Sequence, residues 1–168
     1  MSEEPTIVER PATAYAAIKV LVPMDELGTT VPPLNGEVFQ WLAAHHVAPA
    51  GAPFWKYNVI DMAGRLEVEA GVAVAEPVSG DERVLGGVLP PGLYATTRHV
   101  GHPSTLMAAT AALLEWAAAR GVEWDKAATP DGERWGARLE IYLTDPRDEP
   151  DMNKWVTELA FRCAPGPA

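Results

Sequence analysis

The chain has 168 residues, 48% of them hydrophobic and 21% charged, with a formal net charge of −10. This length supports one sizeable core, or two small modules that share one, and the 13 basic residues among 23 acidic ones offer no basic face for nucleic acid. No apolar run is long enough to cross a membrane, and the lone Cys163 excludes an internal disulfide, so we expect a cytoplasmic protein.

The first part of the chain is expected to form strands. Residues 6–22 are mostly Ala, Ile, Val and Leu and are interrupted by Pro11. This pattern predicts one bent strand or two short ones that end at Pro23. A loop over residues 25–30 is expected to follow.

A helix is expected next, because Pro32-Pro33 can form a first helical turn, where a missing N–H group costs nothing. The helix should run to about His46. One stripe of it is apolar and is expected to face the core: Leu34, Val38, Trp41 and Leu42.

Residues 48–53 are then expected to form a loop. Strands are predicted over residues 54–61 and 66–75, because both segments are rich in apolar and β-branched residues. The turn Met62-Ala63-Gly64-Arg65 has the length and the glycine of a hairpin connection.

Strands are also predicted over residues 82–89 and 93–100, and they are expected to pair with each other around Pro90-Pro91-Gly92. A second helix should then cover residues 104–120. Gly121 follows it directly, as is typical of a helix C-terminus.

The last part of the chain is expected to contain two strands. A charged loop over residues 123–133 leads to a strand that starts at Trp135. A long acidic connection over residues 144–154 leads to the last strand, residues 155–163. The tail, residues 164–168, is expected to fray.

The two helix endings, Trp41-Leu42-Ala43-Ala44 and Trp116-Ala117-Ala118-Ala119, indicate an internal repeat. We interpret the chain as a single domain over residues 1–168 with pseudo-repeats at about 5–77 and 80–163. The expected fold class is α+β: a duplicated β-α-β-β module forms one curved antiparallel sheet with two helices on one face. The other face should be concave and partly open, with a central ligand cleft at the junction of the copies.

The strand that starts at Trp135 carries the most informative pattern. It alternates with a period of two, with Leu139, Ile141 and Leu143 on one face and Arg138, Glu140 and Tyr142 on the other. A carboxylate beside a phenol and close to a tryptophan indicates a surface that holds an aromatic or cationic molecule. Two alternatives are an ordinary solvated strand face and a Glu140 that is paired with Arg138 or Arg162.

Other motifs give little support for catalysis by a metal or cofactor. His45-His46 end a helix, where the helix dipole favours cations, but no further ligand pattern completes a metal site. No P-loop, nucleophile elbow or dinucleotide fingerprint occurs, so we expect no metal and no cofactor. His99 either faces the cleft or packs at the start of the second helix.

Several segments resemble the GyrI-like family, which includes the gyrase-inhibitory protein and the effector-binding domains of multidrug-responsive transcription regulators. The resemblance covers nearly the whole chain, and its most specific run is Trp135–Pro146 followed by Glu149–Phe161. Phe54–Val74 and Leu89–Gly101 also contribute. The resemblance implies the duplicated fold with a ligand in the cleft. It does not extend to a DNA-binding domain, because the chain starts with the first strand, so we expect a free-standing member.

The resemblance also implies roles for individual residues. Glu140 matches a buried glutamate that faces the cationic part of a drug in the regulators, and Tyr142 follows it on the same face. Tyr57 matches a tyrosine that points into the cleft. Trp55 and Trp135 are added because they lie close in sequence to Tyr57 and Glu140. The expected ligand-binding residues are Glu140, Tyr142, Tyr57, Trp55, Trp135, Phe54 and His99.

Three functions are compatible with such a cleft. The first is sequestration of hydrophobic, aromatic or cationic small molecules in drug tolerance, by a monomer or weak homodimer without nucleic acid or membrane partners. The second is a hydrolase that opens the cyclopropane of DNA-alkylating natural products, with Glu140 acting on water and Tyr57 or Tyr142 stabilising the phenolate. The third and weakest is inhibition of a topoisomerase.

Overall fold

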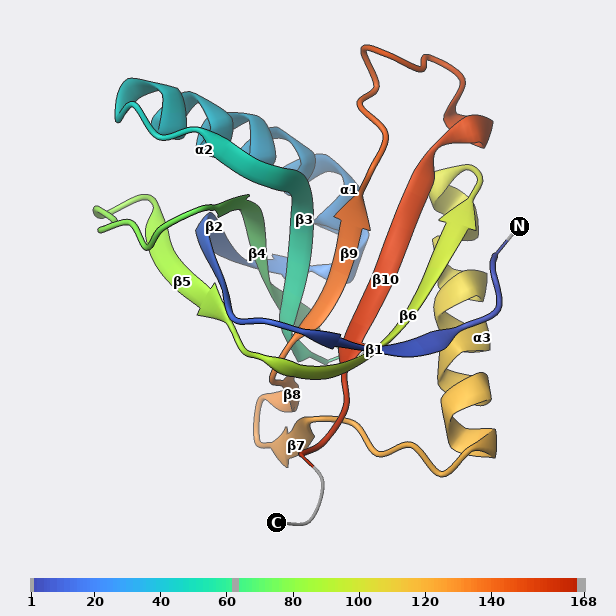
Figure 1. The fold of residues 1–168 in the computed structure, drawn as a ribbon. Helices are drawn as coiled ribbons and strands as arrows, with labels where there is room; N and C mark the ends of the chain where they lie inside the picture. Colours follow the sequence, from blue (N-terminus) through green and yellow to red (C-terminus); the bar gives the residue numbers. More distant parts are fainter. Residues whose placement is uncertain (1, 62–63, 166–168) are drawn as a thin grey trace.

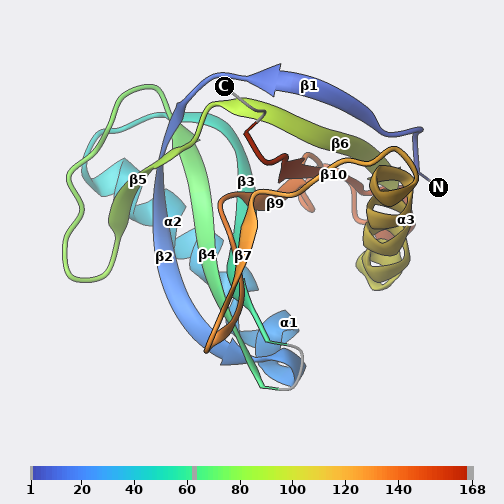
Figure 2. The same cartoon turned by 90° about the horizontal axis from the view of Figure 1, so that it is seen from below.

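The computed structural model describes residues 2–61 and 64–165, and within them the fold is α+β. Ten strands form one antiparallel sheet that is curled into a half-barrel, accompanied by three α-helices in the described residues (Figures 1 and 2). The predicted turn at 62–65 includes Met62 and Ala63, which lie outside the described residues, as do the last three residues of the tail.

The first half of the chain follows most of the expectations. Pro11 separates two strands, which confirms the second form of the prediction for residues 6–22. The predicted loop at 25–30 contains a 3-10 turn and a short helix instead. The elements are β1 (Thr6–Arg10), β2 (Thr13–Pro23), a 3-10 turn (Met24–Glu26), α1 (Leu27–Thr30), α2 (Pro32–Ala44), β3 (Pro49–Ile60) and β4 (Arg65–Val74).

The second half contains one hairpin that the sequence analysis missed, β7–β8, within the predicted loop at 123–133. Gly121 follows the second helix with a φ of +69°, which an L side chain rarely adopts. The elements are β5 (Leu85–Leu89), β6 (Gly92–Val100), a 3-10 turn (Pro103–Thr105), α3 (Leu106–Ala119), β7 (Lys126–Thr129), β8 (Gly132–Trp135), β9 (Arg138–Tyr142), a 3-10 turn (Met152–Lys154) and β10 (Val156–Arg162).

The two halves of the chain meet at the centre of the sheet. The strand order is β1-β6-β10-β9-β3-β4-β2-β5, and the β7–β8 hairpin joins β3 through β8. The junction is the β9–β3 pair. From β9 the sheet continues to β10 and β6, and from β3 it continues to β4 and β2. At the junction, Trp55 of β3 is directly opposite Glu140 of β9.

Both long helices pack on the same face of this sheet. Helix α2 buries Val38 and Leu42 in a cluster that includes Ile18 of β2. Helix α3 buries Leu113 in a cluster with Leu159 of β10. The cross-strand register runs from Leu159 through Glu140, Trp55 and Ala70 to Ile18, so all of these side chains share one face. We call it the helix face; Figure 1 shows α2 and α3 apart from each other over different halves of the sheet.

The opposite face has its own apolar core. It is built around aromatic side chains from three strands and consists of Tyr15, Ala17, Phe54, Leu89, Tyr94, Ala137, Leu139 and Ala160. The predicted placement of the Glu140 side of β9 is therefore wrong: it lies on the helix face, and the Leu139 side lies opposite. The error arose because an apolar alternation shows which residues share a face but not which face of the sheet carries the helices.

Two local predictions need correction. Residues 49–53 belong to β3 rather than to a loop, and a register shift between Pro49 and Pro53 accommodates the prolines, which lack an N–H group for the ladder. The segments 82–89 and 93–100 do not pair with each other: β5 pairs with β2, and β6 pairs with β1 and β10. Between them, Pro90-Pro91 carries the chain across the sheet rather than back in a hairpin (Figure 1).

Candidate functional site

The candidate site lies where β3 and β9 pair on the helix face. Alternation along β3 places Trp55 and Tyr57 on this face, and alternation along β9 places Arg138, Glu140 and Tyr142 there. The two strands run side by side between the halves that carry α2 and α3 (Figure 1). Four of the expected ligand-binding residues therefore come together: Glu140, Tyr142, Tyr57 and Trp55.

Glu140 is the centre of a small hydrogen-bonded cluster. The Tyr142 hydroxyl donates to Glu140 Oε1 over 2.7 Å, and the Tyr57 side chain also donates to this carboxylate. Trp55 packs edge-on against Tyr142, with ring centroids 5.3 Å apart. The arrangement is a half-buried carboxylate held by two phenols with an indole alongside.

Asn35 of α2 fixes the position of the Trp55 ring and was missed in the sequence. Its side-chain oxygen accepts a 2.7 Å hydrogen bond from Trp55 Nε1, and its amide donates to the backbone carbonyl groups of Phe54 and Gly71. The only signal was a polar residue next to Leu34 on the apolar stripe of the helix, which does not by itself indicate a partner on a strand.

Burial raises the pKa of Glu140, while hydrogen bonds from Tyr142 and Tyr57 and the nearby Arg138 partly counteract this shift. Burial, together with the Glu140 charge, raises the pKa values of Tyr57 and Tyr142 well above their usual range. Both phenols therefore stay protonated and act as donors. The ionised carboxylate is costly in this position, and a ligand that brings positive charge would offset that cost.

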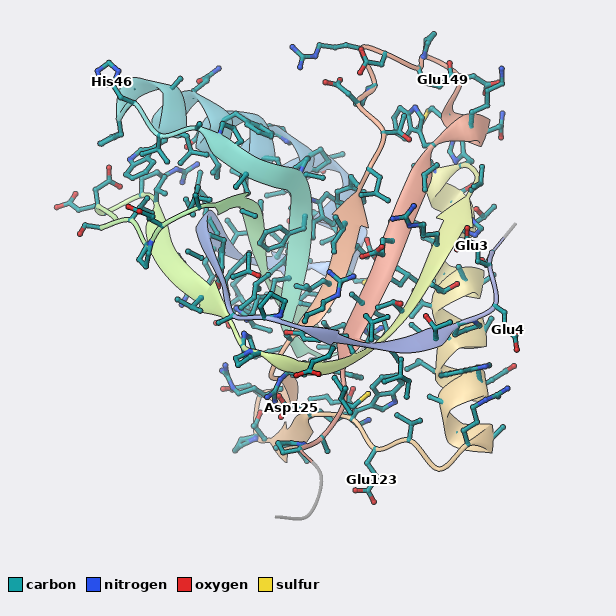
Figure 3. The ribbon with its side chains drawn as sticks, viewed as in Figure 1. Glu3, Glu4, His46, Glu123, Asp125 and Glu149 are labelled. Atoms are coloured by element: carbon teal, nitrogen blue, oxygen red, sulfur yellow. The ribbon has the colours of Figure 1, made fainter. Side chains whose placement is uncertain are left out.

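Arg138 does not form an ion pair with Glu140 among the described residues. Its guanidinium lies 4.7 Å from the ring centroid of Trp135 and 4.6 Å from that of Phe161. The other candidate partner, Arg162, pairs at 2.8 Å with Asp125, which is labelled in Figure 3. The alternative in which Glu140 serves as a cross-strand ion-pair partner is not what the geometry shows.

Three of the expected residues lie elsewhere. Trp135 is buried beside Phe161 at a centroid distance of 5.7 Å and lies under the guanidinium of Arg138. Phe54 points to the opposite face, where it contacts Tyr15.

His99 is engaged at the start of the second helix. Its ring nitrogens form hydrogen bonds with the hydroxyl groups of Ser2, at 2.7 Å, and Thr105, at 2.6 Å. Burial lowers the pKa of His99. Its contacts match the alternative of packing at the helix start.

A cavity of about 280 Å³ opens on the opposite face of the sheet. Glu140 is not among the residues that line it. Its walls are mostly apolar, with two arginines and a glutamate at the rim: Phe54, Leu89, Tyr94, Leu139, Ile141, Leu143, Arg10, Arg98 and Glu158 are among them. The ligand cleft, with Glu140 in it, was expected on the face opposite the helices, whereas Glu140 lies on the helix face. A central cleft at Glu140 stays a prediction.

Within residues 2–61 and 64–165 no three His, Cys, Asp or Glu side chains gather as a metal site would require. His46 lies just beyond the C-terminal end of α2 (Figure 3). His45 stacks on Trp41, with ring centroids 3.9 Å apart. None of the helices in the described part of the chain has the length and apolarity to span a bilayer.

Comparison with known proteins identifies the family. Residues 3–163 match the GyrI-like small molecule binding domain, and the chain belongs to this family. No match was found among curated proteins.

Several solved structures share the fold. The EcmrR–DNA complex is 19% identical with a TM-score of 0.75; the match covers 97% of this chain and 58% of that one, so this chain spans little more than half of that protein's length. SAV2435 bound to tetraphenylphosphonium is 10% identical with a TM-score of 0.61, and the match covers 96% and 94% of the two chains. A hydrolase from Listeria innocua is 16% identical with a TM-score of 0.59, covering 96% and 92%.

Proposed function

We propose that this GyrI-like domain binds hydrophobic, aromatic or cationic small molecules over the Glu140 cluster, on the helix face between α2 and α3. The observation that carries the proposal is a half-buried carboxylate that accepts hydrogen bonds from two phenols and forms no ion pair among the described residues. We further propose that β2-α2-β3-β4 and β6-α3-β9-β10 are copies of one module, with the ligand at their junction.

The chemistry of the cluster favours a flat ligand with positive charge. Trp55 and Tyr142 provide aromatic faces and edges, which attract cations and stack on heterocycles. A cation next to Glu140 would offset the cost of its burial. SAV2435, a distant structural neighbour, was solved with tetraphenylphosphonium, which supports the use of this fold for organic cations.

Under this proposal the protein acts in the cytoplasm, where it would lower the free concentration of a toxic compound by sequestration. Such a role needs affinity and abundance, but it needs no chemical step. A cluster whose strongest features are a charge and aromatic surface suits this role.

The direct test is titration with tetraphenylphosphonium, followed by isothermal calorimetry and by tryptophan fluorescence. Triphenylphosphine oxide is the neutral control of similar shape. We expect the cation to bind more tightly than the neutral compound, and the Trp55→Phe variant to lose most of the fluorescence change. Equal affinity for both compounds, or a fluorescence change that Trp55→Phe leaves intact, would contradict the proposed site.

A hydrolase is the second candidate, favoured by the paired phenol donors on Glu140. Glu140 could accept a proton from water as it attacks a cyclopropane carbon; the bond to the ring opens, and its electrons move to a conjugated dienone oxygen. Tyr57 would stabilise the phenolate that forms. The structural likeness to a hydrolase from Listeria innocua is compatible with this chemistry.

Mass spectrometry separates the two candidates. The protein is incubated with a spirocyclopropane alkylator and compared with a buffer control. A gain of one water above the control rate identifies the hydrolase, and unchanged compound that co-purifies with the protein identifies the binder.

A further inference from the structure

Arg138 is the feature of the site that simple attraction for cations leaves unexplained. It lies two residues before Glu140 on β9, so both side chains point to the helix face, with Cα atoms about 6.6 Å apart at the usual rise of a strand. Its guanidinium rests over Trp135 and Phe161, which hold the long side chain in place.

The guanidinium of Arg138 has hydrogen-bonding capacity to spare. Within the described residues it forms no hydrogen bond and no ion pair, although two carboxylates are close enough to influence its charge. One of them, Glu133, already accepts hydrogen bonds from Lys126 Nζ and from Trp135 Nε1, each at 2.8 Å. The other, Glu140, already accepts hydrogen bonds from the two phenols. A half-buried guanidinium with free N–H donors is matched to an external acceptor.

The charges of the site also favour a ligand that carries an anionic group. An ionised Glu140 and Arg138 together carry no net charge, so a simple cation gains attraction from one and meets repulsion from the other. A ligand with a cationic group and an anionic group separated by a similar distance would be attracted by both. Burial lowers the pKa of Arg138, but guanidinium groups stay protonated in proteins.

We propose that Arg138 makes this site selective for zwitterionic aromatic ligands, by holding a ligand carboxylate on its free guanidinium while Glu140 faces the cationic part. The inference rests on the proposed function and narrows its ligand class. The bond expected is a bidentate guanidinium–carboxylate contact, which a lysine cannot reproduce.

A pair of dyes tests the inference directly. Rhodamine 110 has a free carboxylate, rhodamine 123 is its methyl ester, and both have the same cationic aromatic core. Binding is measured by fluorescence anisotropy at neutral pH. We expect the wild-type protein to bind rhodamine 110 about tenfold more tightly, the scale of one charge-assisted contact.

Two variants and one control assign that preference to Arg138. Arg138→Gln should abolish the preference for rhodamine 110 and leave rhodamine 123 bound at least as tightly as before. Arg138→Lys, which keeps the charge without the bidentate geometry, should show an intermediate preference. Arg134→Gln, an exposed arginine of β8, removes the same charge away from the cluster and should leave the preference unchanged. Thermal unfolding of each variant confirms that it is folded.

The outcomes separate the inference from the proposed function. If wild type binds rhodamine 123 as tightly as rhodamine 110, or if Arg138→Gln and Arg138→Lys both retain the preference, the inference is overturned while small-molecule binding stands. If neither dye nor tetraphenylphosphonium binds, the proposed function fails, and the inference fails with it.

Discussion

Replacing Glu140 by Gln should change ligand affinity and protein stability in opposite directions. Glutamine has nearly the same shape, and its side-chain oxygen can still accept hydrogen bonds from Tyr142 and Tyr57. The substitution therefore removes the charge with little change in packing. An ordinary structural glutamate would behave differently, because its loss would lower stability.

The effect on affinity follows from the charges of the site. A ligand cation about 5 Å from the Glu140 carboxylate gains about 3 kcal/mol at an effective dielectric constant of about 20. Arg138, at about 8 Å from that cation, opposes the gain by about 2 kcal/mol on the same basis. This repulsion is the same in wild type and in Glu140→Gln, so the expected loss in the variant is the whole Glu140 contribution, about 3 kcal/mol, or roughly 100-fold weaker binding of tetraphenylphosphonium.

The effect on stability follows from the pKa. Burial raises the pKa of Glu140 in the folded protein above its ordinary value of 4.5. A carboxyl group whose pKa is raised by folding contributes fully to stability when the pH is below its ordinary pKa. This contribution is lost as the pH rises through the raised pKa of the folded protein. At neutral pH the wild type therefore carries a cost that Glu140→Gln avoids. The variant should unfold at a higher temperature than wild type at neutral pH, and the difference should shrink in acid.

Calorimetric titration and thermal unfolding from acidic to neutral pH measure the two effects on the same samples. Glu115→Gln, at an exposed position on α3, changes the net charge equally and serves as the control. It should alter neither affinity nor the pH dependence of stability. A Glu140→Gln variant that unfolds below wild type at neutral pH would refute the reasoning and make Glu140 a structural residue.

Three further substitutions test the surroundings. Tyr142→Phe removes a donor that lowers the pKa of Glu140, so it should cost about 1 kcal/mol of stability and move the pH profile of cation binding to higher pH; an unmoved profile contradicts the coupling. Glu69→Ala would strand the buried Lys56, 3.4 Å away, and should lower the free energy of unfolding in urea by about 3–5 kcal/mol; a loss below 1 kcal/mol would mean that Lys56 reaches water. Gly71→Ala would place a Cβ atom 2.6 Å from the Phe54 ring and should cost about 1–3 kcal/mol in the same assay without changing ligand affinity at the helix face; unchanged stability would show that the ring moves aside.

The sequence was sufficient to predict which residues of the last strands share a face, but it did not predict which face that is. The alternation of Leu139 and Ile141 with Glu140 and Tyr142 is local and survives in the structure. The side of the sheet on which the helices pack is decided by clusters that join residues distant in sequence, such as Leu113 and Leu159. When both faces of a strand carry partly buried side chains, local hydrophobicity does not show which face the helices occupy.

The candidates next to one another in sequence show the same limit. Phe54 and Trp55 were both expected to bind ligand, yet neighbouring residues of a strand point to opposite faces. Only Trp55 joins the Glu140 cluster. Asn35, which holds the Trp55 indole, could be found only after α2 was placed against β3.

The site depends on one pairing register between distant parts of the chain. Trp55 is opposite Glu140 only in the observed β3–β9 register, and a slip by one residue would turn the Trp55 side of β3 to the other face. Two features outside the site fix that register: a shift in the β3–β4 ladder between Tyr57 and Val59, and the pairing of Val59 with Arg134 of β8. The β7–β8 hairpin, which the sequence pattern did not reveal, therefore helps to align the first half of the site with the second. The hairpin contributes no residue to the Glu140 cluster. A segment that only aligns two strands needs no particular reactive side chain, so the sequence does not reveal this role.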